Sequence, residues 1–486
     1  MFERSRRPHA VVAALLLSGA LPSRAFSENG VDPAAALDRA VAAAEKGLRE
    51  GELEEAESEY RAALLEGWLL MGALETAAGR LPEARDAFRA ASTSAVETGR
   101  PLRALALADL RLGQTAPAVA VLTQLARKDP HDAQVRRLLA RAQAGEPSGP
   151  ADNPSPLAAL APAAKLDLEH RVKAELVRVY MNLGVMHTQG QRFSRGAELF
   201  ERAAAIDPGS PQVQYALGVA RFNARHFAEA TGPLARALAA HPEDAGLRRM
   251  LAMAWLNSEA FDKAAELLRD DPEREADASL QFAYGLALVR SDRAREAQPV
   301  FARLLARHGD SAEVRVVLGQ ANAQQGDFEA AIRELTQALR LDPRVAEANA
   351  TLGVIYLKQG RLAEAEEALR RELTTRPDDV KSQNALATVL DLLGRPEEAV
   401  PLLRDALESK PDFADARYLL GKILLAQGKA SAALEHLEAA VRLAPEDANI
   451  HYQLARAYQT LGRTDEAQQE FEVFRQLKEK RRKSAP

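Results

Sequence analysis

Histidines and paired acidic side chains are the groups in this chain that could carry acid–base or metal chemistry. The nine histidines are dispersed, and none forms a His-Glu-x-x-His pair or stands in a glycine-rich turn. Glu366-Glu367, Asp378-Asp379 and Glu397-Glu398 could act as acid and base. Each pair, however, falls on an exposed face or at the start of an expected helix, where acidic side chains favour solubility and the helix dipole. No metal, cofactor or catalytic site is therefore expected.

Nucleophilic and phosphate-binding motifs are also missing from the sequence. The chain has no cysteine, which excludes disulfides, thiolate nucleophiles and cysteine-based metal sites. It contains no Gly-x-x-x-x-Gly-Lys loop and no Gly-x-Ser-x-Gly elbow. His187 lies inside an expected helix hairpin, so we interpret it as a packed side chain rather than a ligand. These absences predict that the protein is not an enzyme.

The composition favours closely packed helices. Of the 486 residues, 47% are hydrophobic but only 5% are aromatic, so burial depends on alanine and leucine. Charged residues make up 27%, as expected where each helix keeps one face in water. The formal net charge of −5 gives no reason to expect nucleic acid as a general ligand.

The segment at residues 352–377 predicts two short helices folded against each other. Gly353 falls inside the first helix, where glycine costs about 1 kcal/mol relative to alanine, so a neighbouring side chain is expected to press closely there. Gly360 stands where that helix must end, and Pro377 stops the second helix. Ala365 is the small residue that the second helix presents to the first. Such a hairpin cannot bury its own apolar faces and needs copies on either side.

The copies recur with a period of 34 residues. Steps of that length from Gly353 reach Gly285, Gly319, Ala387, Gly421 and Ala455. The alanine of the second helix recurs at Ala297, Ala331, Ala399, Ala433 and Ala467, and the proline at Pro343, Pro411 and Pro445. This pattern resembles the tetratricopeptide repeat family, whose motif places Trp, Leu-Gly, Tyr, Ala, Phe, Ala and Pro over 34 residues. The resemblance implies an all-α, right-handed superhelical solenoid of antiparallel helix hairpins, with about twelve repeats.

Residues 1–25 have the three-part layout of a secretory signal peptide. Three arginines precede an apolar run at residues 10–21, and Ser23 and Ala25 lie at the −3 and −1 positions of a cleavage site. The apolar run is short for a bilayer span. We expect an exported protein, periplasmic or secreted, with an uncleaved N-terminal membrane anchor as the alternative.

The rest of the chain is expected to form two arrays of repeats. We divide it into an N-terminal array of about three and a half repeats at 31–144, a proline-rich linker at 145–162, a C-terminal array of nine repeats at 163–478 and a basic tail at 479–486. Within the first array, only 28 residues separate Ala44 from Gly72, so a shortened loop is expected between the repeats.

Two interpretations of the proline-rich segment remain open. It is either a linker between two arrays or an insertion in one continuous solenoid. The helix expected at residues 132–144 lacks a partner, and under the second interpretation the helix beginning near Ala163 fills the vacant place.

Any binding site must then lie on a surface of the solenoid. The resemblance implies that the first helix of each hairpin lines a concave groove that holds partner peptides or helices. Positions three residues before and one after the Gly/Ala step would face this groove, and Phe222 would join them one helical turn further on. The candidate contact residues are Tyr215, Phe222, Met253, Phe282, Leu286, Asn384, Tyr418, Lys422, Tyr452 and Arg456. The alternative is that these are ordinary packing residues between repeats.

This lining suits an amphipathic partner segment. Its apolar end would meet Tyr215, Met253 and Phe282, and its acidic end would meet Lys422 and Arg456. We therefore expect a non-enzymatic scaffold that binds other proteins, in envelope assembly, trafficking or secretion. The alternatives are a membrane-associated accessory subunit, held by the N-terminal segment or the basic tail, and an enzyme with a site grafted across the groove. The sequence leaves the oligomeric state open.

Overall fold

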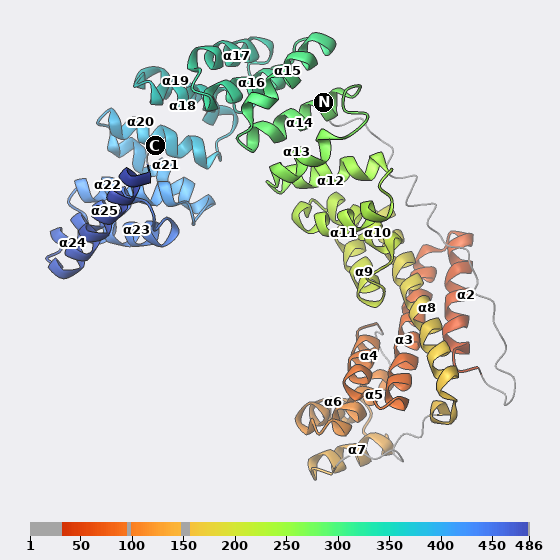
Figure 1. Ribbon diagram of the computed structural model, residues 1–486. Helices are drawn as coiled ribbons and strands as arrows, with labels where there is room; N and C mark the ends of the chain where they lie inside the picture. The colour runs from red at the N-terminus through yellow and green to blue at the C-terminus, as the bar shows by residue number, and fades with distance from the viewer. Residues whose placement is uncertain (1–31, 95–98, 147–155, 485–486) are drawn as a thin grey trace. The chain divides into compact units, whose positions relative to one another are not determined.

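The structure, a computed structural model, describes residues 32–94, 99–146 and 156–484. The expected signal peptide lies outside these residues. The chain divides into two compact units, residues 1–260 and 261–486, and each is described by itself. Within the described residues, all regular elements are helices (Figure 1). No helix of this part of the chain has the length and apolar character needed to cross a bilayer.

The first unit contains two groups of helices. The helices before the proline-rich segment are α2 (Ala35–Glu50), α3 (Leu53–Ala77), α4 (Leu81–Ser94), α5 (Gly99–Arg111), α6 (Thr115–Lys128) and α7 (Ala133–Gln143). A short 3-10 helix, η2 (Pro156–Ala159), precedes α8 (Pro162–Gln189), α9 (Phe193–Ile206), α10 (Pro211–Asn223), α11 (Phe227–Ala240) and α12 (Ala245–Asn257).

The second unit is a regular series of hairpins. It comprises α13 (Phe261–Arg269), α14 (Ala278–Arg290), α15 (Ala294–His308), α16 (Ala312–Gln324), α17 (Phe328–Leu341), α18 (Ala348–Lys358), α19 (Leu362–Thr375), α20 (Val380–Leu392), α21 (Pro396–Ser409), α22 (Ala414–Ala426), α23 (Ala430–Leu443), α24 (Ala448–Thr460) and α25 (Thr464–Ser484). Each helix packs on the next, and the first helices, α14 to α24, also pack on one another. The chain is thus an all-α solenoid, in which the first helices form a continuous layer.

The hairpins close as the sequence predicts. A Cβ atom on Gly353 would lie 2.5 Å from Leu369 Cγ, so only glycine allows this close approach of α18 and α19. Gly360 ends α18 in the left-handed region, with φ of 73°. Ala365 and its counterpart Ala399 are fully buried. These contacts confirm the period and phase of the repeat.

The first unit departs from this pattern at α3. The sequence predicts a shortened loop between Ala44 and Gly72, but this prediction is wrong, because α3 runs unbroken through residues 53–77. Its first half carries Tyr60 and Ala63, the buried stripe of a second helix, against α2. Its second half carries Gly72, which receives the Phe88 ring of α4 as a first helix would. One helix therefore serves two consecutive hairpins.

α8 packs against α3, far away in the sequence. Leu176 is fully buried and lies directly against Gly67, where an added Cβ would come within 2.7 Å of its Cδ2 atom. Trp68 Nε1 donates a hydrogen bond of 2.8 Å to Tyr180 Oη, and Asn182 Nδ2 donates one of 2.9 Å to Tyr60 Oη. The main stack of this unit therefore passes from α3 to α8, while α4 to α7 form a separate side arm on the second half of α3.

This packing bears on the proline-rich segment. The contacts of α7 are with α5 and α6, whereas α8 contacts α3, α9 and α10. α8 therefore does not take the place beside α7 that one of the two interpretations assigns to it. The end of the segment is partly buried: Leu157 of η2 lies in the core shared by α2, α3 and α8. The predicted division into two arrays stays a prediction.

Many first helices carry a polar residue where the family motif has tryptophan. Gln214 Nε2 donates to the carbonyl oxygen of Pro208 at 3.0 Å, and Gln383 Nε2 to that of Pro377 at 2.9 Å. The same contact, always six residues back along the chain, is made by Arg248, Gln281, Arg417 and His451. A hydrogen bond thus ties the start of each of these helices to the loop that precedes it.

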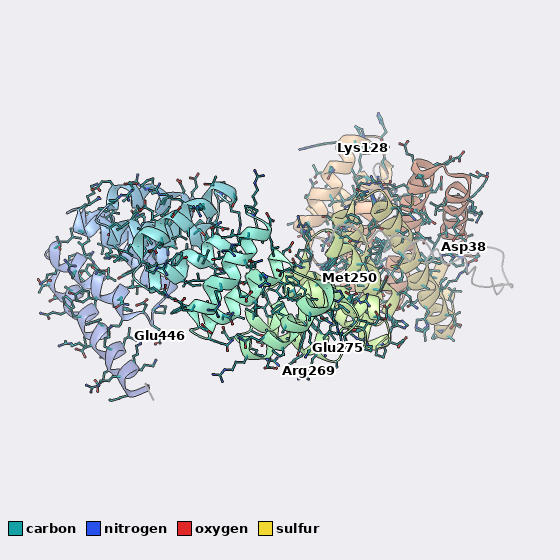
Figure 2. All side chains as sticks on the ribbon, turned by 90° about the horizontal axis from the view of Figure 1, so that it is seen from above. Asp38, Lys128, Met250, Arg269, Glu275 and Glu446 are labelled. Carbon is teal, nitrogen blue, oxygen red and sulfur yellow. The ribbon has the colours of Figure 1, made fainter. Side chains whose placement is uncertain are left out.

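The basic end of α25 is engaged with the protein itself. Lys480 Nζ lies 3.0 Å from a carboxylate oxygen of Glu446, which is labelled in Figure 2. Lys483 pairs with Glu479 at 2.8 Å, and Lys478 lies 5.7 Å from the centre of the Phe474 ring. These contacts are those of a helix end that pairs within the chain, and contact of the tail with a membrane stays a prediction.

Candidate functional site

The candidate contact residues fall on first helices of both units. Tyr215 and Phe222 lie on α10 and Met253 on α12, all in the first unit and all half-buried. Phe222 contacts Phe227 of α11 edge-on, with ring centres 5.3 Å apart. Burial raises the pKa of Tyr215. The role of these residues in partner binding stays a prediction.

The remaining candidates lie in the second unit. Phe282 and Leu286 are on α14, Asn384 on α20, Tyr418 and Lys422 on α22, and Tyr452 and Arg456 on α24. Phe282 packs edge-on against Phe301 of its own hairpin, with ring centres 6.3 Å apart. Asn384 is half-buried, and no hydrogen-bond partner among the described residues satisfies its Oδ1 atom. Burial raises the pKa of Tyr418.

Lys422 and Tyr452 also have partners within the chain. Lys422 Nζ lies 2.7 Å from Asp391 Oδ2 of the preceding first helix, so this ammonium group is already neutralised. The Tyr452 ring contacts Phe471 and Phe474 of α25, with ring centres 6.0 and 5.3 Å away. Arg456 is exposed and forms no ion pair with a described residue, and its Nη1 atom donates a hydrogen bond of 3.4 Å to Gln453 Oε1. The expected acidic end of a partner would therefore meet one free cation here rather than two.

A cavity of about 440 Å³ opens among the first helices of the second unit, and none of the ten candidates is among its lining residues. Three of its lining residues, Gln320, Ala350 and Val354, are at the predicted groove positions of α16 and α18. Further lining residues are Arg290, Phe328, Glu347, Thr351, Ile355, Lys358, Arg376, Asp379, Lys381 and Ser382. The cavity thus includes predicted groove positions. It lies in the middle of the series of hairpins, between the candidates on α14 and those on α22 and α24.

The cavity forms where α18 begins late. α20, α22 and α24 begin at Val380, Ala414 and Ala448, in step with the 34-residue period, and the period places the start of α18 at residue 346. α18 instead begins at Ala348, and Glu347 before it has a φ of 68°, in the left-handed region. A residue with a side chain reaches this region only at a cost of about 1 kcal/mol. The first turn of this helix is therefore replaced by a strained turn.

Glu372 of α19 explains the late start. It stands seven residues after Ala365, where most neighbouring repeats have alanine, and it is 1% exposed. Its carboxylate accepts hydrogen bonds from the backbone N–H groups of Glu347 and Ala350, at 3.3 and 3.2 Å. Arg376 Nη1 lies 3.3 Å from the same carboxylate. A buried charge of this kind persists only when it is paired. Glu372 is paired with the backbone N–H groups at the start of α18.

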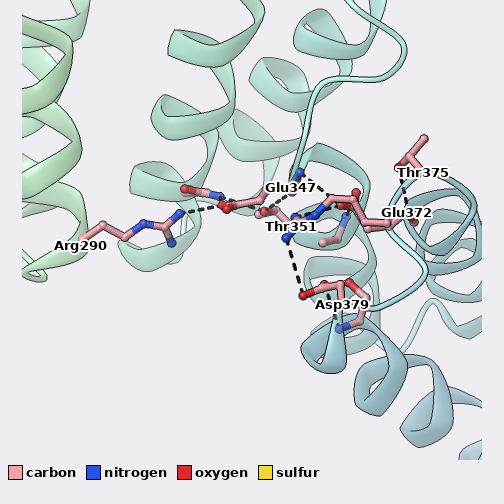
Figure 3. Close-up of polar contacts among 10 residues, drawn as sticks. Arg290, Glu347, Thr351, Glu372, Thr375 and Asp379 are labelled. Carbon is pink, nitrogen blue, oxygen red and sulfur yellow. Dashed lines mark hydrogen bonds and ion pairs between the residues drawn. The ribbon is translucent and has the colours of Figure 1, made fainter. Parts of the chain in front are cut away.

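Glu347 in turn contacts two other residues that line the cavity, one of which is Arg290 (Figure 3). Its Oε2 atom accepts a hydrogen bond of 2.7 Å from Arg290 of α14 and one of 2.8 Å from Gln320 of α16. Burial by itself would raise the pKa of the Glu347 carboxyl, but the Gln320 hydrogen bond and the Arg290 guanidinium together lower it. The carboxylate is thus ionised at neutral pH and joins three successive first helices.

The sequence contains one signal for this site. A glutamate at position 372, in place of the small residue, breaks the apolar pattern of a second helix and predicts a buried charge in need of partners. Arg290 and Glu347 are 57 residues apart, and nothing in the sequence links them before the stacking of the repeats is known.

Comparison with known families agrees with the hairpin structure. Models described as tetratricopeptide repeat match residues 103–148, 157–211 and 215–273, and a second such family matches residues 424–476. The C-terminal domain of cilia and flagella-associated protein 70 matches residues 276–444. The chain is a tetratricopeptide repeat protein. The coarse function of such repeats is that of a scaffold for protein–protein interaction.

Solved tetratricopeptide repeat proteins align with parts of the chain. MamA is 26% identical to this chain, and the alignment covers 34% of this chain and 97% of MamA, with a TM-score of 0.31. YrrB, described as a TPR protein with an unusual peptide-binding site, is 22% identical, with a TM-score of 0.33 over 36% of this chain and 91% of its own. The comparison with curated proteins finds no match. At these TM-scores the binding surface has to be derived from this chain's own residues.

Proposed function

We propose that this protein is a non-enzymatic scaffold whose second unit holds a segment of a partner protein in the groove along its first helices. One observation carries the proposal: the lining of the cavity at α16, α18 and α20 includes groove positions of two successive repeats, Gln320 on α16 and Ala350 and Val354 on α18. Its volume of about 440 Å³ is in the range of sites that bind small ligands or a few side chains of a peptide.

The lining of the cavity suits a peptide with both apolar and polar side chains. Val354, Ala350 and Phe328 supply apolar surface, and Val354 is 39% exposed. Lys358 and Lys381 are exposed at the same cavity, and neither forms an ion pair with a described residue. Apolar contacts would supply affinity, and the charged groups would fix the register of the segment.

Export of the protein is part of the proposal. Its support is the arrangement of arginines, apolar run and small residues at residues 1–25. In that compartment the scaffold would serve the assembly or trafficking of envelope or secreted components. A membrane-associated accessory subunit is the alternative, and it depends on the same N-terminal segment remaining uncleaved or on the basic tail.

Site-specific photo-crosslinking tests the groove. With a photoreactive phenylalanine derivative in place of Val354, irradiation of cells that produce the protein is expected to yield a discrete crosslinked partner. The matched control carries the same derivative at Ala363, which is exposed on α19 and does not line the cavity. Equal crosslinking from both positions, or from the control alone, would show that partners do not use this groove.

The mass of the mature chain tests export. The protein recovered from the exported fraction is expected to begin after Ala25, and intact-mass spectrometry measures this directly. A full-length mass for protein held in the membrane fraction would instead support the anchored accessory subunit. Full-length protein confined to the cytoplasm would contradict both.

A further inference from the structure

One carboxylate of the protein, that of Glu347, lies where a ligand would bind. Arg290 and Gln320 both donate a hydrogen bond to Glu347 Oε2, and all three residues line the cavity. The two donors come from α14 and α16, the first helices of the two preceding hairpins. Together they form a site for one carboxylate group in the middle of the groove (Figure 3).

The backbone that carries Glu347 is under strain. Its φ of 68° persists because the carboxylate of Glu372 binds the N–H groups of Glu347 and Ala350. The contact between Glu347 and Arg290 is also not a deeply buried one, because the two side chains are 40% and 37% exposed. An exposed ion pair of this kind contributes little to stability, so its replacement by another carboxylate costs the fold little.

Unused groups surround this position. Ser382 lines the cavity and is only 2% exposed, and no described residue is a hydrogen-bond partner for its hydroxyl. The Oε1 atom of Gln320 is likewise buried without a partner among the described residues. A buried polar group without a partner costs free energy, so both atoms favour a ligand that supplies one. An acceptor for the hydroxyl and an N–H for the amide oxygen are both present in a peptide.

The charges around the cavity favour an acid. Its lining residues include the cations Arg290, Lys358, Arg376 and Lys381 and the anions Glu347 and Asp379. Arg376 is already paired with Glu372 and Asp379. When the Glu347 side chain moves into water, the other three cations, Arg290, Lys358 and Lys381, have no ion-pair partner among the lining residues. A partner carboxylate would then gain charge-assisted hydrogen bonds that an amide cannot form equally well.

We propose that Glu347 occupies the place of an aspartate or glutamate side chain of the partner segment, which displaces it from Arg290 and Gln320. This inference rests on the proposed function, because it names the residue type that the groove selects. Glu347 then acts as an internal competitor, which a partner of the right chemistry replaces and which neutral segments leave in place.

Two peptide libraries and three variants of the full chain test this inference. The probes are nonapeptides with random flanks and a fixed central residue, glutamate in one library and glutamine in the other. The wild-type protein is expected to retain more of the glutamate library. Glu347→Gln removes the competing charge and is expected to raise retention of that library about fivefold. Glu347→Gly, which tolerates the positive φ, is expected to do the same.

Arg290→Gln is expected to abolish the preference for glutamate. The control is Glu367→Gln, which removes an exposed carboxylate of α19 that pairs with Arg371 outside the cavity and is expected to change nothing. If peptides bind but the ratio between the two libraries stays the same in all variants, the inference is overturned and the proposed function stands. If no variant retains either library, the groove does not bind peptides and both proposals fail.

Discussion

Ala399→Glu is expected to lower the free energy of unfolding of the second unit by about 3–5 kcal/mol. Ala399 is fully buried on α21, in the core that it shares with α20 and α22. A glutamate there would bring a charge into an apolar site that has neither room nor a partner for it. The measurement is thermal or denaturant unfolding followed by circular dichroism.

The control for this substitution is Ala432→Glu. Ala432 lies on α23, the corresponding helix of the next hairpin, but it is exposed. The melting temperature of the Ala432→Glu variant is therefore expected to stay close to that of the wild type. An unchanged melting temperature for Ala399→Glu would mean that the repeat has been placed in the wrong phase.

Leu176→Ala is expected to cost about 2–5 kcal/mol in the first unit. This side chain is fully buried where α8 meets α3, and it fills the space beside Gly67. Its removal leaves a cavity in the contact that joins the main stack across more than a hundred residues of sequence. Denaturant unfolding is expected to show a lower midpoint for the first unit.

Leu166→Ala provides the matched control on the same helix. Leu166 is 52% exposed, so its loss is expected to change stability by only a few tenths of a kcal/mol. If the two variants are equally stable, α8 does not depend on α3, and the contacts of Trp68 and Asn182 across this boundary contribute nothing.

The regular part of the fold was predictable because each rule there is local. A glycine opposite a leucine, a positive φ at the turn and a buried alanine recur at fixed spacing, and Gly353, Gly360 and Ala365 occupy these places as expected. For the same reason the sequence did not predict that α3 is one continuous helix. Its two halves each carry a correct local pattern, and nothing in the apolar period says that no loop separates them.

The binding surface was less predictable. The groove positions could be located from the period, but the groups that neutralise them could not. Lys422 looked like a free cation until the structure placed Asp391 beside it. Conversely, the repeat pattern gives no signal at Glu347. Its role depends on Glu372 and on Arg290, which only the stacked hairpins bring near it.

The continuous helix α3 has a consequence for how this protein can change over time. In a simple row of hairpins, the gain or loss of one hairpin changes the distance between the hairpins on either side of it. α8 packs directly on α3. The helices α4 to α7 are attached to α3 through α4 and do not lie between α3 and α8. Duplication or loss of hairpins in this side arm would leave the register of the main row untouched, so homologues are free to differ most in the length of this branch.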